Sequence, residues 1–237
     1  MSEGTALENP RKAVVFDLDD TLYCERDYVR SGYRAVAASM AADPAAAEAV
    51  AAWMWRRFCE GRGERMFNAA AERFGLPDDP ATIAGWVACY RDHAPILQPH
   101  PDAVAVLDAL RGRVRLGLLS DGFLPAQSIK LDALGLRGYF DAIVFTEAMG
   151  RDCWKPSAAG FERIAAELGV PHACCAYVGD NPAKDFVAPN ALGWLTIQWR
   201  RDGQVHADKP AAAGGAAQIV VRDAAALLAA LDLGVCR

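Results

Sequence analysis

The sequence predicts an α/β protein, in which a parallel β-sheet carries helices on both faces and a second, all-helical domain is inserted into the sheet domain. Short runs of β-branched and other apolar residues alternate with helical patterns along most of the 237 residues. The early runs end abruptly in polar residues, as strands buried in parallel sheets do. Between the first two runs, residues 25–97 show only helical periodicity, which indicates the inserted domain.

The first predicted strand ends in carboxylates. Residues 14–16 read Val-Val-Phe, and Asp17, Asp19 and Asp20 follow closely. Ligands of open α/β sheets bind in the crevice beyond the carboxyl ends of the strands. Asp17 and Asp19 are two residues apart at such an end, so both are expected to face the crevice and to form part of a working site.

The insertion is predicted to consist of helices alone. Apolar residues recur at helical spacing in stretches separated by Pro or Gly, at about 27–40, 44–58, 66–74 and 83–90. No strand pattern interrupts them. The predicted division is therefore a core domain of residues 1–24 and 98–237 and a helical domain of residues 25–97.

The core is predicted to resume with alternating helices and strands, which favours parallel strands joined by right-handed crossovers. This topology brings Ser120 and Asp180 to the same sheet edge as Asp17. The Gly- and Ala-rich residues 203–217 are expected to form a mobile loop. Predicted strands cover 114–119, 142–145, 174–178, 195–198 and 219–221, and predicted helices cover 101–110, 124–134, 157–168 and the residues after 223.

Composition excludes several classes of function. The net charge is −5, and the arginines do not form the continuous basic stripe of a nucleic-acid-binding protein. No apolar stretch is long enough to span a membrane. The seven cysteines are dispersed, so free thiols in a reducing cytoplasm are expected. A small phosphorylated metabolite stays compatible as a partner, for a monomer or a homodimer.

Four motifs follow one another along the chain. They are Asp17-Leu18-Asp19-Asp20-Thr21, Leu118-Leu119-Ser120-Asp121-Gly122, Lys155-Pro156 and Gly179-Asp180-Asn181-Pro182-Ala183-Lys184-Asp185. Taken in order, they resemble the motifs of the haloacid dehalogenase (HAD) superfamily, and the resemblance extends over nearly the whole chain. It implies a Rossmann-like core. In subfamily I of this superfamily, an insertion after the first motif is a helical cap of the C1 type, which folds over the active site.

The resemblance implies a role for each acidic motif residue. Asp17 is expected to attack phosphorus and to form an aspartyl-phosphate. Asp19 is expected to act first as general acid and then as general base, with a pKa above the usual value of about 3.9. Mg²⁺ suits such hard oxygen ligands. Its expected ligands are Asp17, the backbone carbonyl of Asp19 and Asp180, with Asp185 in a supporting role.

The second and third motifs are expected to bind the substrate phosphate. Ser120, Asp121 and Gly122 end a predicted strand in a turn whose N–H groups suit phosphate oxygens. The ammonium of Lys155 would neutralise the phosphoryl group and the nucleophile. The alternatives are that Ser120 is only a helix N-cap and that Lys155 is an ordinary solvated lysine.

Structural roles stay open for the other polar residues. The motif aspartates can also cap helices or end strands. Asp20 is expected to be a solvated turn residue, whereas Thr21 is expected to hydrogen-bond the loop that orients Asp17. The arginines of the helical domain are more typical of a solvated helix face than of substrate recognition.

The expected reaction is the Mg²⁺-dependent hydrolysis of a small phosphate monoester, such as a sugar phosphate or a nucleotide monophosphate. Asp19 argues against dehalogenation, because a departing halide needs no proton. Residues 25–97 contain no lysine, which excludes the Schiff-base chemistry of phosphonate hydrolysis. A phosphomutase shares every core motif and is the first alternative. A non-catalytic phosphate-binding scaffold is the second.

Overall fold

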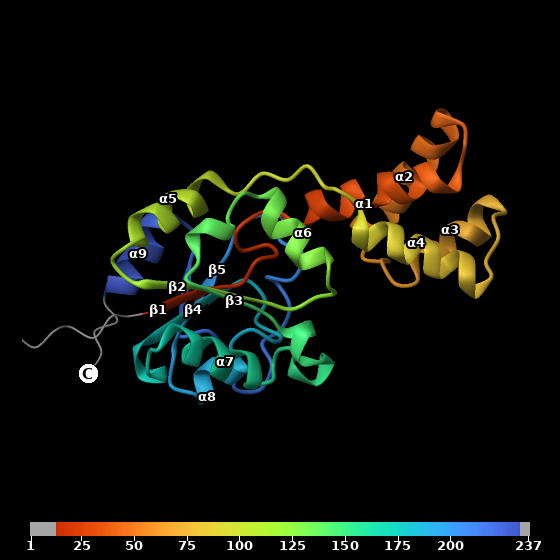
Figure 1. The fold of residues 1–237 in the computed structure, drawn as a ribbon. Helices are drawn as coiled ribbons and strands as arrows, with labels where there is room; N and C mark the ends of the chain where they lie inside the picture. Colours follow the sequence, from red (N-terminus) through yellow and green to blue (C-terminus); the bar gives the residue numbers. More distant parts are fainter. Residues whose placement is uncertain (1–12, 233–237) are drawn as a thin grey trace, which may run out of the picture. The chain divides into compact units, whose positions relative to one another are not determined.

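The structure is a computed structural model in which residues 13–232 are described. Its core is a six-stranded, all-parallel sheet with the strand order β3-β2-β1-β4-β5-β6 (Figure 1). This arrangement confirms the predicted α/β fold class. The strands are β1 (Ala13–Phe16), β2 (Arg115–Ser120), β3 (Ala142–Phe145), β4 (Cys175–Gly179), β5 (Leu195–Trp199) and β6 (Ile219–Val221).

Helices cover both faces of the sheet. In Figure 1, α5 and α9 lie on one face, and α7 and α8 lie on the other. Short 3-10 helices occupy several connections between β2 and β4. The core helices are α5 (Pro101–Leu110), α7 (Ala159–Leu168), α8 (Val187–Ala191) and α9 (Ala224–Asp232), and the 3-10 helices are Arg137–Tyr139, Thr146–Met149, Arg151–Cys153 and His172–Cys174.

β1 lies at the centre of the sheet and is buried along its whole length. It pairs with β2 on one side and with β4 on the other, so that Phe16 lies opposite Leu118 and Val178. Full burial of a Val or Phe side chain stabilises a fold by about 1.5–3 kcal/mol. The apolar run therefore holds the strand firmly, and the first polar residue after it is placed at the carboxyl edge of the sheet.

Close packing of α7 on the sheet depends on a glycine in β2. A Cβ atom at Gly117 would lie 2.9 Å from Cδ1 of Ile164 and 3.1 Å from Cδ1 of Leu168, both on α7. A larger residue would push the helix away from the strand that ends in Ser120. α8 is short, and Pro189 lies in its first turn, where an N–H has no partner within the helix.

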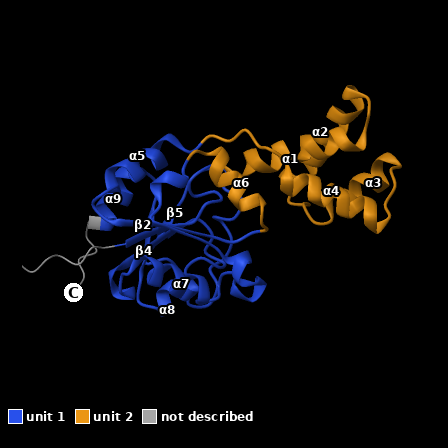
Figure 2. Cartoon of the chain, viewed as in Figure 1, with its two compact units in different colours: residues 1–23, 99–122, 136–237 blue, residues 24–98, 123–135 orange. Residues whose placement is uncertain are grey.

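The chain forms two compact units (Figure 2). The second unit contains residues 24–98, which nearly coincide with the predicted insertion, and also residues 123–135, which the sequence pattern predicts to lie in the core. In this unit, Lys130 Nζ lies 4.2 Å from the ring centre of Tyr28, and the Arg91 guanidinium lies 3.4 Å from that of Phe123. The helices of this unit are α1 (Glu25–Met40), α2 (Pro44–Cys59), α3 (Met66–Phe74), α4 (Pro80–Asp92) and α6 (Ala126–Ala133).

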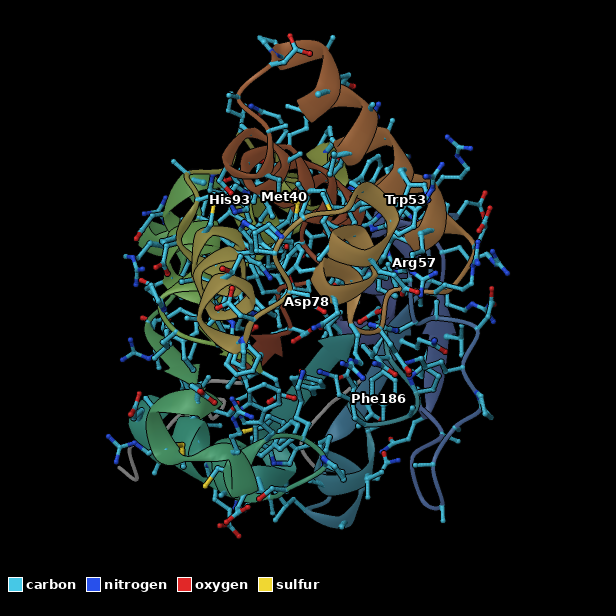
Figure 3. All side chains as sticks on the ribbon, turned by 90° about the vertical axis from the view of Figure 1, so that its right-hand side faces the viewer. Met40, Trp53, Arg57, Asp78, His93 and Phe186 are labelled. Atoms are coloured by element: carbon cyan, nitrogen blue, oxygen red, sulfur yellow. The ribbon has the colours of Figure 1, made fainter. Side chains whose placement is uncertain are left out.

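Two helices of the second unit begin with the same capping motif, an Asp N-cap followed by Pro. Asp43 accepts a hydrogen bond from the backbone of Ala46, and Asp79 accepts from Ala81 and Thr82, while Pro occupies the first helical position in both. Arginines of this unit lie against aromatic rings, as Arg57 does against Trp53 one turn away on α2 (Figure 3). Such contacts are typical of a helix surface.

The cysteines differ from the expectation in one case. Cys24, Cys59, Cys89, Cys153 and Cys175 are free thiols. Cys174 is disulfide-bonded, so the expectation of free thiols is wrong at this position, and Cys236 lies outside the described residues. Among residues 13–232, no helix combines the length and apolar character that crossing a membrane requires.

Candidate active site

Acidic side chains from the two ends of the chain meet at the carboxyl edge of the sheet. Asp17 follows β1, and its backbone N–H donates to the carbonyl of Val178 in β4 at 2.9 Å, which keeps the two strand ends together. Asp180 follows β4 directly. Carboxylate oxygens of Asp17, Asp180 and Asp185 lie within 4.8 Å of one another, and all three residues are buried.

Lys155 inserts its ammonium among these acids. Its Nζ lies 2.7 Å from Asp17 Oδ1 and 2.8 Å from Asp185 Oδ1, and it donates to the hydroxyl of Tyr177 at 2.9 Å. The side chain is only 1% exposed. The alternative of an ordinary solvated lysine is therefore wrong.

Burial and charge compete at this cluster. Burial raises the pKa of Asp17 to about 7, with a further upward contribution from Asp185, although Lys155 opposes both. Burial acts to lower the pKa of Lys155, but Asp17 and Asp185 raise it well above its ordinary value. Lys155 therefore stays an ammonium. At neutral pH, Asp17 occurs in both its protonated and its ionised form.

The donor set fits a hard divalent cation. Asp17, Asp180 and Asp185 offer buried carboxylate oxygens within 4.8 Å of one another, and oxygen ligands of this kind are those that Mg²⁺ prefers. Asp185 pairs with Lys155 through Oδ1 and accepts from the backbone N–H of Asn181 through Oδ2 at 2.9 Å. Because both of its oxygens serve protein contacts, Asp185 suits the supporting role, and Asp17 and Asp180 suit direct ligation.

Metal binding at this cluster should release a proton. Asp17 must ionise to bind the cation, and its pKa is about 7. Mg²⁺ affinity should therefore fall about tenfold for each pH unit below 7 and level off above pH 8. Calorimetry in buffers of different ionisation enthalpy should show release of about one proton at pH 6, and an affinity independent of pH would contradict this account.

The residues around Asp19 differ from expectation. Asp19 is partly buried and accepts a hydrogen bond from the hydroxyl of Tyr23. Asp20 is 1% exposed and left-handed (φ 55°), and its Oδ2 accepts from the backbone N–H of Val205, so it is not a solvated turn residue. The Thr21 hydroxyl is buried and makes no hydrogen bond within the described part of the chain, so its expected role in orienting the loop is also wrong.

Ser120 ends β2 at the same edge and is buried. The next helix, α6, begins only at Ala126 and is capped at Pro125, so Ser120 is not a helix N-cap. Gly122 has a φ of 128°, which favours glycine over other residues. The turn after Ser120 therefore does not cap a helix, which is compatible with its expected role in phosphate binding.

The Asp121 carboxylate contacts several groups around the site. It accepts from the backbone N–H of Lys155 at 3.2 Å and from the Thr146 hydroxyl at 2.8 Å, and it pairs with Lys184 Nζ at 3.1 Å. Burial acts to raise the pKa of Asp121, but Lys155 and Lys184 hold it below the usual value. Its side chain therefore helps to position the backbone of Lys155.

Comparison with known proteins decides the family. The model of the haloacid dehalogenase-like hydrolases matches residues 11–193. The chain belongs to the haloacid dehalogenase-like hydrolases. It is 31% identical over 198 residues to a glyceraldehyde 3-phosphate phosphatase of Methanopyrus kandleri, which covers 80% of this chain and 84% of that protein.

Other proteins match a shorter part of this hydrolase or its fold. The pyrimidine 5'-nucleotidase YjjG of Escherichia coli is 34% identical over 45% of this chain and 49% of its own. The HAD-hydrolase YfnB of Bacillus subtilis, described as bound to magnesium, superposes with a TM-score of 0.69 over 94% of this chain and 99% of its own, at 18% identity. Structures described as dehalogenases superpose with a TM-score of about 0.60 at 20% identity. At such identities the likeness shows the fold alone.

Sequence reasoning missed several residues of this site in the hydrolase. Tyr177 lies inside the apolar strand β4, and its hydroxyl accepts a hydrogen bond from Lys155. Lys184 lies within the fourth motif and pairs with Asp121. Thr146 binds Asp121 from the turn after β3. The sequence signal for Tyr177 was its hydroxyl, a polar group within an otherwise apolar buried strand.

His206 should make the hydrolase less stable in mild acid. Burial lowers the pKa of His206 to about 4, with Lys209 and Lys184 contributing, whereas an unfolded histidine titrates near 6.5. Below pH 6.5 the histidine takes up a proton in the unfolded chain but not in the folded chain. The contribution of His206 to the free energy of unfolding is therefore highest above pH 7 and decreases as the pH falls to about 4. Discounted for partial exposure, the loss is about 1–2 kcal/mol.

The control for this effect is His206→Gln. Urea unfolding at pH 7.5 and pH 5 should show a smaller loss of stability in the variant than in the wild type. Equal losses in the two proteins would show that His206 does not contribute to the acid sensitivity.

Proposed function

We propose that this hydrolase is a Mg²⁺-dependent phosphatase that acts on small phosphate monoesters through an aspartyl-phosphate on Asp17. One observation carries the proposal: buried oxygens of Asp17, Asp180 and Asp185 lie within 4.8 Å of one another, and the Lys155 ammonium touches two of these acids. The names of the relatives, which are phosphatases of small phosphorylated molecules, support it.

In the first step, a carboxylate oxygen of Asp17 attacks phosphorus, and the bond from phosphorus to the leaving oxygen breaks. Lys155 balances the charge of the nucleophile and of the phosphoryl oxygens. Asp19 gives its proton to the departing alkoxide. Mg²⁺, held by Asp17, the Asp19 carbonyl and Asp180, would supply charge compensation for the phosphoryl group.

In the second step, Asp19 acts as a base. It accepts a proton from a water molecule, whose oxygen attacks phosphorus. The bond between phosphorus and the Asp17 carboxylate breaks, and inorganic phosphate leaves. Asp17 is then a free carboxylate and Asp19 carries a proton again, so the site is ready for another turnover.

The substrate is proposed to be a sugar phosphate or a nucleotide monophosphate in the cytoplasm, with the helical unit acting as the C1 cap. A phosphomutase would use the same core residues, but the relatives named above are hydrolases of phosphate esters, which favours transfer to water. The acidic residue at Asp19 argues against dehalogenation, as outlined above.

A screen of phosphorylated metabolites tests this proposal. Released inorganic phosphate should be measured with Mg²⁺ and with EDTA, over sugar phosphates, nucleotide monophosphates and phosphoamino acids. Mg²⁺-dependent phosphate release from at least one ester is expected. Binding of phosphate esters without release from any of them would favour the scaffold instead.

A further inference from the structure

The loop after β5 is tied to both acidic loops of the site. Residues 200–207, called the strap here, overlap the stretch that was expected to be a mobile loop. The strap contains no helix or strand, yet its residues make hydrogen bonds to the loop after β1 and, through Gln198, to the loop after β4. These hydrogen bonds link residues 204–207 of that stretch to neighbouring loops.

Gln204 makes the central contacts of the strap. Its side-chain amide donates to the carbonyl of Asp20 at 2.6 Å and to that of Trp199 at 2.9 Å. Its Oε1 accepts from the backbone N–H of Arg201 at 2.8 Å. The next residue, Val205, donates its backbone N–H to Asp20 Oδ2 at 2.6 Å. The strap thus binds both the carbonyl and the carboxylate of Asp20.

Gln198 connects the strap to the other acidic loop. It lies in β5, is buried, and donates from one amide nitrogen to the carbonyl of Asp180 at 2.8 Å and to that of Ala207 at 3.2 Å. The strap is therefore linked on one side to the loop of Asp17 and Asp19 and on the other to the loop of Asp180.

The backbone conformation of Asp20 affects the direction of the Asp19 carbonyl. Asp20 has a φ of 55°, a conformation that residues other than glycine rarely adopt. The carbonyl of Asp19 belongs to the peptide that joins it to Asp20, so φ at Asp20 sets the direction of that carbonyl relative to the chain that follows. Gln204 and Val205 both donate hydrogen bonds to this residue.

We infer that Gln204 is a positioning residue: it holds Asp20 in the left-handed conformation and so aims the backbone carbonyl of Asp19 at the metal site. The inference rests on the proposed function, which makes that carbonyl a ligand of Mg²⁺. Supporting partners of metal ligands typically change metal affinity or activity by about 10–100-fold.

The test uses Gln204→Met, which keeps the volume of the side chain and removes its hydrogen bonds, and Gln204→Glu, which keeps an acceptor for Arg201 and removes both donors. Gln218→Met is the matched control, because the Gln218 amide donates to the carbonyl of Trp194 at 2.8 Å, away from Asp20. Calorimetry measures Mg²⁺ affinity without substrate, and steady-state kinetics measures kcat and KM for an aryl phosphate.

Both Gln204 variants are expected to bind Mg²⁺ about tenfold more weakly and to lose kcat by about 10–100-fold, with KM within about twofold of the wild type. Gln218→Met should match the wild type. Wild-type Mg²⁺ affinity and kcat in both Gln204 variants would overturn the inference, whatever their thermal stability, since a merely structural role would lower only stability.

The two proposals fail separately. Should the wild type release no phosphate from any ester but bind Mg²⁺, weaker binding in the Gln204 variants would still support the positioning role while the phosphatase proposal falls. Should the wild type be an active Mg²⁺-dependent phosphatase with neutral Gln204 variants, the positioning role falls alone. A wild type that binds no Mg²⁺ would overturn both.

Discussion

Replacing Asp17 by Asn is expected to reduce turnover of an aryl phosphate by on the order of 10⁵-fold. The amide keeps the size of the side chain but cannot form an acyl phosphate. Steady-state phosphate release with Mg²⁺ measures the effect, and the thermal stability of the variant should be close to that of the wild type, because Lys155 keeps its pairing with Asp185.

Asp43→Asn is the matched control for this substitution. Asp43 caps α2 in the helical unit, and Asn is an equally good N-cap. The control should retain full activity. An Asp17→Asn variant that kept more than about a tenth of wild-type turnover would contradict the assignment of the nucleophile, because such a residue is expected to contribute several orders of magnitude.

Replacing Lys155 by Met should cost both activity and stability. The ammonium is 1% exposed and lies within 2.8 Å of two buried carboxylates, which the variant would leave without their cation. Breaking a buried ion pair from one side costs about 3–5 kcal/mol, and removing a charge that stabilises the reacting group costs about 10²–10³-fold in turnover. Urea unfolding with EDTA and phosphate release with Mg²⁺ measure the two effects.

The destabilisation in Lys155→Met should depend on pH. The pKa of Asp17 is already raised in the folded protein, and loss of the ammonium would raise it further. Folding of the variant then favours the protonated form of Asp17. The free energy of unfolding of the variant is therefore highest below the unfolded pKa of about 4 and decreases as the pH rises through the folded pKa of Asp17. The difference from the wild type should be larger at pH 8 than at pH 5.

Lys184→Met is the matched control for Lys155. Lys184 pairs with Asp121 at 3.1 Å, and its side chain is 33% exposed. The expected cost is about 1 kcal/mol or less, because water screens the pair. Equal destabilisation in the two lysine variants would show that the buried position of Lys155 is not what matters.

The sequence predicted the fold and the meeting of the acids for one physical reason. Apolar runs such as the one before Asp17 are typical of central parallel strands, and parallel strands end at a common edge. Asp17, Ser120 and Asp180 each lie at the end of such a run, so the local pattern was sufficient to bring them together. Their chemical roles, by contrast, rest on resemblance and stay proposals.

The sequence could not predict the features that depend on distant partners. Asp20 reads as a turn residue because its partner Gln204 is 184 positions away in the chain. The strap reads as a mobile loop because its hydrogen bonds use backbone groups and glutamine amides, which carry no local signal. α6 reads as an ordinary core helix, although its segment belongs to the helical unit.

Phosphorylation of Asp17 during turnover can be detected by acid quenching and peptide mass spectrometry. The wild type should be mixed rapidly with a fast substrate and Mg²⁺, quenched in acid, which preserves acyl phosphates, and digested for peptide mass spectrometry. A phosphoryl group is expected on Asp17, and none when Mg²⁺ is replaced by EDTA. Phosphorylation of another residue, or of none during measurable turnover, would contradict the account.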